Sequence, residues 1–137
     1  MPERGVPPAL LRAYRRTRYA VPGVTVRIGR RSAGMDALLA RHQAARAVFV
    51  TAWNPFSRRM PAGWNRRMQA RLRQLLHRRL CLPAVGALGR WHEDHLLVLA
   101  ELPPLLRLAR QFRQHAVVAI RRGGPARLVL LSRPGAS

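Results

Sequence analysis

Apolar residues recur at the spacing of an α-helix in one long segment of the chain, residues 62–80. The residues on this stripe are Trp64, Met68, Leu72, Leu75 and Leu76. They follow the i, i+4, i+8 and i+11 spacing of one helical face, with polar residues between them. Pro61 or Gly63 marks the start of the pattern, and Pro83 prevents its continuation. The segment is therefore predicted to be an amphipathic helix.

Shorter segments carry the alternating or continuous apolar patterns of β-strands. The predicted strands are residues 24–28, 47–51, 84–88, 93–100, 116–120 and 127–131. Residues 47–51 include an apolar run without alternation, which is typical of a strand buried on both faces. Shorter helices are predicted over residues 34–41, from Pro103 onward, and near the N-terminus, where Leu10, Leu11 and Tyr14 share a face.

The order of these elements predicts the fold class. Residues 47–120 read β-α-β-β-α-β, the split βαβ order of the ferredoxin-like fold. We therefore predict an α+β two-layer sandwich whose antiparallel or mixed sheet carries helices on one face, with the ferredoxin-like fold as a candidate topology. The chain has 137 residues, 48% of them hydrophobic, which is enough for one domain. We assign that domain to residues 9–132, with a disordered lead-in over residues 1–8 and a flexible tail over residues 133–137.

The sequence carries few signals of cellular location. The N-terminal residues lack the apolar stretch of a secretory signal, and the most apolar run, residues 96–106, is too short to span a bilayer. A lone cysteine, Cys81, excludes an intramolecular disulfide and a cysteine-rich zinc site. We expect a cytoplasmic protein that does not engage a membrane.

Charge is the most unusual property of the composition. Arginine accounts for all 26 basic residues, five residues are acidic, and the formal net charge is +21. A GC-rich coding sequence explains arginine in place of lysine, but it does not explain the scarcity of acids. Two interpretations stay open: a surface that binds nucleic acid or another polyanion, and a merely basic solvated surface. The candidate phosphate-binding residues are Arg58, Arg59, Arg66, Arg67, Arg71, Arg73 and Arg78.

A second signal is the polar segment Thr51-Ala-Trp-Asn-Pro-Phe-Ser57, which follows a predicted strand and precedes the long helix. This segment, the aromatic pair Tyr14 and Tyr19, the Trp91-x-Glu93 motif and the residues around Gln114 resemble the bacterial domain-of-unknown-function family 3293, over roughly residues 12–120. The resemblance implies a compact bacterial domain, and it carries over no activity. It also implies a shared polar set: Tyr19, Thr51, Asn54, Ser57, Asn65, Glu93 and Gln114. Two residues depart from the family pattern: His95 stands where serine is usual, and Arg113 where glycine is usual.

The polar set suggests a second kind of function. Amides and hydroxyls read hydrogen-bonding edges, so these residues suit a nucleotide or another small polar ligand. Glu93 would serve as a general base if a pocket raised its pKa; otherwise we expect it to pair with an arginine. Asn54 and Ser57 have a simpler alternative role, in which they only hold the backbone of their own loop.

The remaining chemistry is sparse. In the sequence His92-Glu-Asp-His95, strand alternation would put two candidate ligands on each face, too few for a metal site without help from His42, His77 or His115, so we predict no metal. The sequence has no Walker A loop or dinucleotide-binding glycine fingerprint, and we predict no cofactor. The principal interpretation is a small basic module that binds nucleic acid or another polyanion. The alternative is a small enzyme or nucleotide-binding protein that uses the polar set, and a third is a domain that meets an acidic protein partner. Whether the chain is an enzyme is left open by the sequence.

Overall fold

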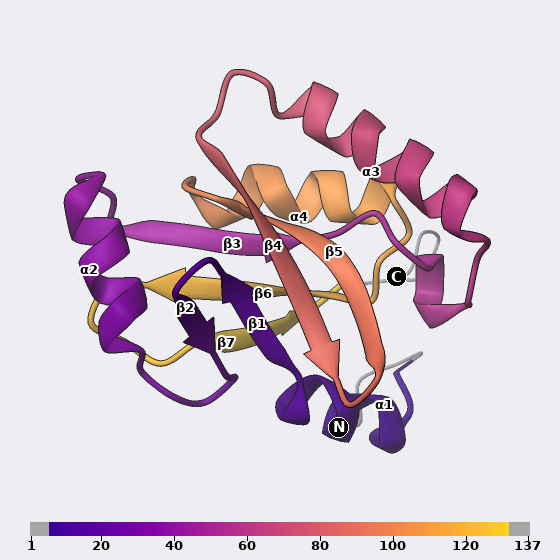
Figure 1. Ribbon diagram of the computed structural model, residues 1–137, viewed down its shortest axis with the longest axis horizontal. Helices are drawn as coiled ribbons and strands as arrows, with labels where there is room; N and C mark the ends of the chain where they lie inside the picture. The colour runs from indigo at the N-terminus through magenta and orange to yellow at the C-terminus, as the bar shows by residue number, and fades with distance from the viewer. Residues whose placement is uncertain (1–5, 132–137) are drawn as a thin grey trace.

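The computed structural model describes residues 6–131, which fold into four α-helices, a short 3-10 helix and seven strands (Figure 1). The helices are α1 (Pro8–Arg16), α2 (Ala33–Arg41), α3 (Ala62–Leu75) and α4 (Leu102–Gln111), with the 3-10 helix η1 at Pro55–Ser57. The strands are β1 (Arg18–Val21), β2 (Val24–Val26), β3 (Arg46–Val50), β4 (Cys81–Leu88), β5 (Trp91–Val98), β6 (Ala116–Arg121) and β7 (Arg127–Leu130).

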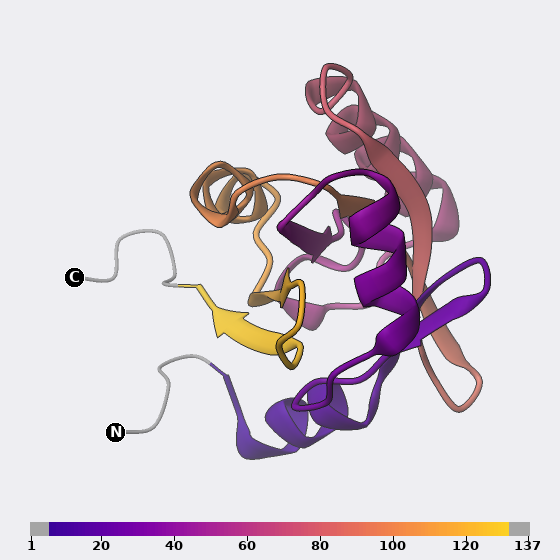
Figure 2. The same ribbon diagram turned by 90° about the vertical axis from the view of Figure 1, so that its left-hand side faces the viewer.

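The strands form one antiparallel sheet in the order β2-β1-β4-β5-β3-β6-β7. The sheet curls, because the chain after β2 comes back to the segment just before β7. There Ile28 forms a parallel bridge with Ala126, and the Gly29 N–H donates to the Ala126 carbonyl oxygen at 2.8 Å. The two edges of the sheet thus approach each other and give a half-barrel, with α2 across the end that faces the viewer in Figure 2.

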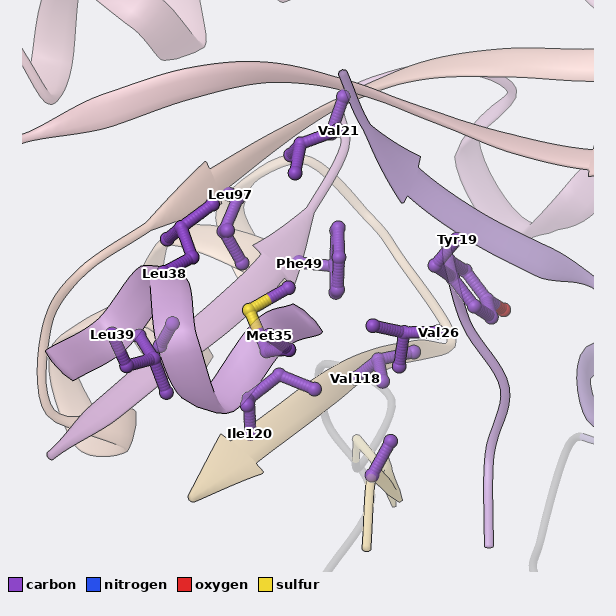
Figure 3. Close-up of a cluster of buried hydrophobic side chains, with 13 residues drawn as sticks. Tyr19, Val21, Val26, Met35, Leu38, Leu39, Phe49, Leu97, Val118 and Ile120 are labelled. Carbon is purple, nitrogen blue, oxygen red and sulfur yellow. The ribbon is translucent and has the colours of Figure 1, made fainter. Parts of the chain in front are cut away.

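Strand β3 divides the hydrophobic interior into two cores because both of its faces are buried. Ala47 and Phe49 point into an inner core enclosed by the curled sheet and α2 (Figure 3). Val48 and Val50 point the other way, into an outer core that α3 and α4 complete. This arrangement confirms the interpretation of residues 47–51 as a strand buried on both sides.

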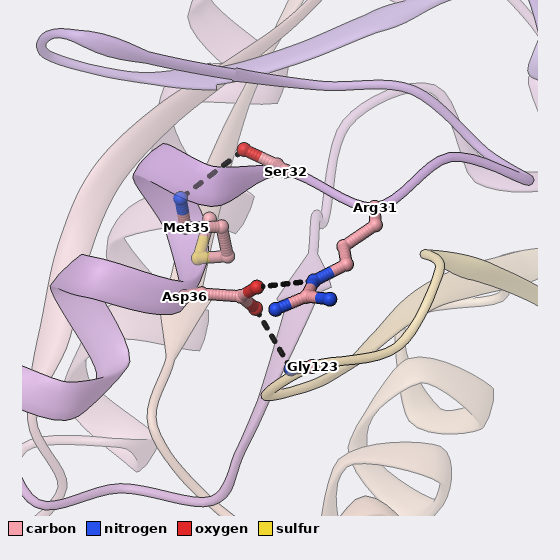
Figure 4. A network of polar contacts seen from close by, with 5 residues as sticks. All are labelled: Arg31, Ser32, Met35, Asp36 and Gly123. Atoms are coloured by element: carbon pink, nitrogen blue, oxygen red, sulfur yellow. Dashed lines mark hydrogen bonds and ion pairs between the residues drawn. The ribbon is translucent and has the colours of Figure 1, made fainter.

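A carboxylate ties α2 to the turn between β6 and β7 (Figure 4). Asp36 accepts a hydrogen bond from the Gly123 N–H at 2.8 Å and an ion-paired bond from Arg31 Nε at 2.8 Å. These bonds, with the Gly123 N–H contributing most, lower the pKa of Asp36. Ser32 caps the helix by accepting the Met35 N–H at 3.1 Å. Together these contacts hold α2 over the end of the half-barrel.

The α+β class is confirmed, and the sheet is antiparallel. The predicted placement of the helices on one face of the sheet holds only for α3 and α4. Helix α2 packs in the inner core on the opposite face. The two-layer sandwich and the ferredoxin-like assignment stay predictions. Strand β1 was not expected from the sequence, because Arg18–Val21 is too short for its alternation to stand out.

The predicted stripe of the long helix is wrong in part. Leu72 and Leu76 are buried, but Leu75 is 54% exposed, and α3 ends there instead of continuing to residue 80. The buried face runs through Asn65 and Gln69 instead, two polar residues that an apolar pattern cannot identify.

Two predictions concern the ends and the location of the chain. The predicted tail and residues 1–5 of the predicted lead-in lie outside the described residues, and α1 begins at Pro8. Within residues 6–131, no helix combines the length and the apolar character needed to cross a membrane.

The residue after the end of α4 yields a prediction about stability. Arg113 has φ +56°, in the left-handed region, which costs a non-glycine residue about 1–2 kcal/mol. Replacing Arg113 by glycine removes this strain at a smaller cost in unfolded-state entropy, so Arg113→Gly should stabilise the fold by about 1 kcal/mol. Urea denaturation measures the change.

Arg110→Gly is the matched control, because it removes the same side chain from within α4. It should destabilise the protein by about 1 kcal/mol. A destabilised Arg113→Gly variant would show that the side chain of Arg113, not its backbone, matters at this position.

Candidate functional site

A cavity of about 1140 Å³ opens between α1, the loop after β3 and the tip of the β4–β5 hairpin. Every member of the polar set named from the sequence lines it. These residues are Tyr19, Thr51, Asn54, Ser57, Asn65, Glu93 and Gln114. They come from β1, the loop, α3, β5 and the segment after α4, so segments far apart in the sequence supply the polar wall of one pocket.

The loop after β3 is unusual in its backbone. Asn54, Phe56 and Ser57 all have φ between +48° and +61°, a region that asparagine tolerates better than other non-glycine residues. The Phe56 N–H donates to the Arg113 carbonyl oxygen at 2.7 Å, which fastens the loop to the end of α4. Backbone strain of this kind clusters at functional sites, where the surrounding structure enforces it.

Asn54 is the centre of the polar network. Its N–H donates to Asn65 Oδ1 at 3.0 Å, and its own Oδ1 accepts from Asn65 Nδ2 at 3.0 Å and from the Met60 N–H at 2.9 Å. Its Nδ2 donates to Glu93 Oε2 at 2.7 Å. Asn54 therefore holds the loop backbone, which is the simpler role considered for it, and it also positions the carboxyl group of Glu93 on β5.

Thr51 and Gln114 hold the same loop from its two sides. The Thr51 hydroxyl donates to the Asp94 carbonyl oxygen at 2.6 Å and accepts the Trp53 N–H at 3.0 Å. Gln114 Nε2 donates to the Trp53 carbonyl oxygen at 3.0 Å. Gln69, which the sequence did not single out, accepts the Ala52 N–H at 2.9 Å. Its position one turn after Asn65, on the same helical face, is the only signal the sequence offers.

Among the acidic residues that the structure describes, Glu93 is the buried one, with 9% of its surface exposed. Burial raises its pKa to about 7, and the hydrogen bond from Asn54 offsets part of that shift. The expected pairing with an arginine is wrong for the described residues, because the ion pairs among them involve Asp36 and Glu101. With no ion pair among residues 6–131, the Glu93 carboxyl group therefore changes its protonation state near neutral pH.

The neighbouring titratable groups stay neutral. His95 is buried, burial lowers its pKa to about 4, and its Nδ1 lies 3.1 Å from the Glu93 carbonyl oxygen. Burial raises the pKa of Tyr14 to about 12, with the nearby Ser57 hydroxyl offsetting part of the shift, and burial also raises the pKa of Tyr19. Of these four groups only Glu93 changes its protonation state near neutral pH.

Aromatic and cationic side chains complete the lining. Trp53 lies against His92, with ring centroids 6.0 Å apart, and its indole Nε1 is buried without a hydrogen-bond partner among residues 6–131. Trp91, at the tip of the hairpin, is 45% exposed. Three exposed arginines also line the cavity: Arg59, Arg66 and Arg90.

Strand alternation in β5 is as the sequence predicted, and it separates the histidines from each other. His92 and Asp94 are exposed, whereas Glu93 and His95 are buried. No group of three histidine, cysteine or acidic side chains within residues 6–131 is placed to hold a metal ion.

The arginines proposed for phosphate binding are exposed, but so are all the other arginines among residues 6–131. The proposed set follows the loop, α3 and the turn after α3, and two of its members, Arg59 and Arg66, line the cavity. Exposed arginines also occur on α1, α2 and α4. The basic surface therefore extends well beyond α3.

A family model described as a protein of unknown function (DUF3293) matches residues 50–117. This match confirms the resemblance found in the sequence. It runs from the end of β3 to the start of β6 and so includes Thr51, Asn54, Asn65, Glu93 and Gln114, whereas Tyr14 and Tyr19 lie before it. No curated protein and no solved structure matches the chain.

The buried carboxyl group predicts how stability depends on pH. The pKa of Glu93 rises from 4.5 to about 7 on folding, so its contribution to stability is complete below pH 4.5 and is lost as the pH rises to about 7. The loss is on the order of 3 kcal/mol. Glu93→Gln keeps an acceptor for Asn54 and removes the charge, so the variant should gain stability relative to the wild type as the pH rises. Urea denaturation between about pH 4 and pH 9 measures this difference.

The pH profile of the wild type alone does not isolate the effect of Glu93, because the pKa of His95 also changes on folding. Its pKa is lowered from 6.5 to about 4, so its contribution is lost as the pH falls through that range, opposite in sign to the change from Glu93. Asp94→Asn, at the exposed neighbouring position, is the control and should leave the pH profile unchanged. Parallel profiles for Glu93→Gln and the wild type would mean that Glu93 ionises at its ordinary pKa.

Proposed function

We propose that this domain binds a small polar ligand in the cavity and that Glu93 exchanges a proton with that ligand. The observation that carries the proposal is the buried Glu93 carboxyl group, which forms no ion pair within residues 6–131 and lies in the wall of a cavity of about 1140 Å³. A binding domain whose pocket contains a titratable group is also what an enzyme using general acid–base catalysis requires.

Because the protein is strongly basic, it is informative that no described arginine forms an ion pair with Glu93. The chain carries 26 arginines, and an arginine beside a buried carboxylate would lower its pKa and relieve the cost of burial. Glu93 instead receives a neutral amide donor at 2.7 Å. Strongly perturbed titratable groups that lie in a cavity and not in an ion pair are more frequent at functional sites than elsewhere.

The atoms around the carboxyl group suit proton transfer. Asn54 fixes Oε2, and Oε1 has no hydrogen-bond partner among the described residues, so Oε1 is the atom left to meet a ligand. With a pKa of about 7, Glu93 takes or releases a proton at a small cost in free energy near neutral pH. His95 and Tyr14, neutral throughout this range, contribute shape and dipoles to the wall.

A thermal-shift experiment tests this proposal with wild-type protein, Glu93→Gln and Asp94→Asn. The probes are nucleosides, nucleotides, amino acids and small carboxylates, each at about pH 6 and about pH 8. We expect at least one probe to raise the Tm of the wild type by an amount that differs between the two pH values. The same probe should give equal shifts at both pH values with Glu93→Gln, while Asp94→Asn should behave as the wild type.

Mass spectrometry of small molecules released from the purified protein extends the search beyond the panel. If no probe shifts the Tm and the protein carries no small molecule, the proposal fails.

A second candidate function is binding of nucleic acid or another polyanion along α3. The observation that favours it is the row of exposed arginines on the loop and α3, none of which forms an ion pair with a described acid. Phosphate contacts release counterions, so each contact in a single-stranded complex changes the salt slope by about 0.7.

Salt titration with single-stranded RNA distinguishes an interface on α3 from a generally basic surface. The variant replaces Arg67, Arg71, Arg73 and Arg78 by glutamine, and the matched control replaces Arg107, Arg110, Arg121 and Arg127. If α3 is the interface, the first variant should lose about 3 units of slope and the control much less. Equal losses in the two variants would mean that no part of the surface is specialised.

A further inference from the structure

The charges around the cavity favour one class of ligand. Three arginines line it, Arg59 and Arg66 from one side and Arg90 from the β4–β5 turn, and Glu93 is the acid among its lining residues. All three arginines are exposed, and none pairs with a described acid. A concave site lined by three arginines and one acid, in a protein of net charge +21, concentrates anions.

The start of α3 adds to this attraction. Pro61 and Ala62 line the cavity, and the helix has no side-chain cap and no acidic residue in its first turn. Its 14 residues give it a dipole whose positive end lies beside Arg59 and Arg66. Guanidinium groups and the N-terminus of a helix both bind phosphate groups.

The rest of the lining is aromatic and able to form directional hydrogen bonds. Tyr14, Trp53 and Trp91 present rings, which stack on planar heterocycles. Trp53 Nε1 is a buried donor without a partner among residues 6–131, and the hydrogen bond that the Glu93 carboxyl group accepts there, from Asn54, is to Oε2 and not to Oε1. A protonated carboxyl group both donates and accepts, and so matches the paired donors and acceptors of a nucleobase edge.

Resting on the proposed function, we infer that the ligand of this cavity is a nucleotide. Its phosphate lies against Arg59, Arg66 and Arg90, and its base lies among the aromatic side chains within reach of Glu93. The cavity, at about 1140 Å³, is large enough for a nucleoside monophosphate. The same chemistry is present in a free mononucleotide and in the terminal nucleotide of a nucleic acid.

Calorimetric titration tests this inference with AMP, GMP, CMP and UMP, the corresponding nucleosides, inorganic phosphate and a short 5′-phosphorylated RNA. At least one monophosphate should bind roughly tenfold more tightly than its nucleoside and than inorganic phosphate, because both halves contribute contacts. If the RNA binds more tightly than the monophosphate, the source is a nucleic-acid end, and if it binds less tightly the source is the free nucleotide. Either order supports the shared chemistry.

Two triple variants separate a site from the overall charge. The first replaces Arg59, Arg66 and Arg90 by glutamine, and the matched control replaces Arg107, Arg110 and Arg121, which do not line the cavity. The first should weaken monophosphate binding by at least about tenfold, and the control by a few-fold at most at about 0.15 M salt, where distant charges are screened. Equal weakening would overturn the inference, because binding would then follow net charge. Circular dichroism and Tm confirm that each variant is folded.

The outcomes also separate this inference from the function on which it rests. If another class of molecule binds in a manner that Glu93→Gln alters, and no monophosphate does, the nucleotide inference fails while the proposed pocket stands. If nothing binds, both fail. Trp53→Phe keeps a ring and removes the indole N–H, so it should weaken monophosphate binding several-fold, and its Tm shows whether the variant is folded.

Discussion

The architecture of the cavity depends on how the backbone is satisfied where β3 ends. Both faces of this strand are buried, so the chain leaves the sheet inside the protein, where an unpaired N–H costs about 1–3 kcal/mol. Three successive backbone N–H groups donate hydrogen bonds to side-chain acceptors. The Ala52 N–H donates to Gln69, the Trp53 N–H to Thr51, and the Asn54 N–H to Asn65. A polar face on α3 is thus a consequence of a strand that is apolar on both sides.

That requirement explains why the cavity is polar next to an apolar core. Asn65 and Gln69 occupy the positions on α3 that would otherwise carry apolar residues, and they draw the loop against the helix. Asn54, in the left-handed conformation, then directs its amide toward Glu93 on β5. The position of the carboxyl group therefore follows from a chain of hydrogen bonds that begins with the backbone of the loop.

Much of the fold could be predicted from the sequence because its signals are local. The alternation in β5 correctly separated His92 from Glu93, and the apolar run 47–51 correctly indicated a strand buried on both sides. What failed depends on tertiary contacts. Leu75 fits an ideal apolar stripe, yet it is exposed, because the buried face of α3 runs through Asn65, Gln69 and Leu72 instead. The curl of the sheet rests on the bridge between Ile28 and Ala126, which no local pattern encodes.

The candidate site shows the same division between local and tertiary information. Family resemblance named the seven polar residues, but it could not indicate that they share one wall or that no described arginine reaches Glu93. That separation has a consequence for any anion in the cavity. A negative charge near Glu93 disfavours the carboxylate and raises its pKa further, so binding of an anion takes up a proton near neutral pH. The arginines would attract such an anion, and the carboxyl group would make its binding depend on pH, because all of them line one cavity.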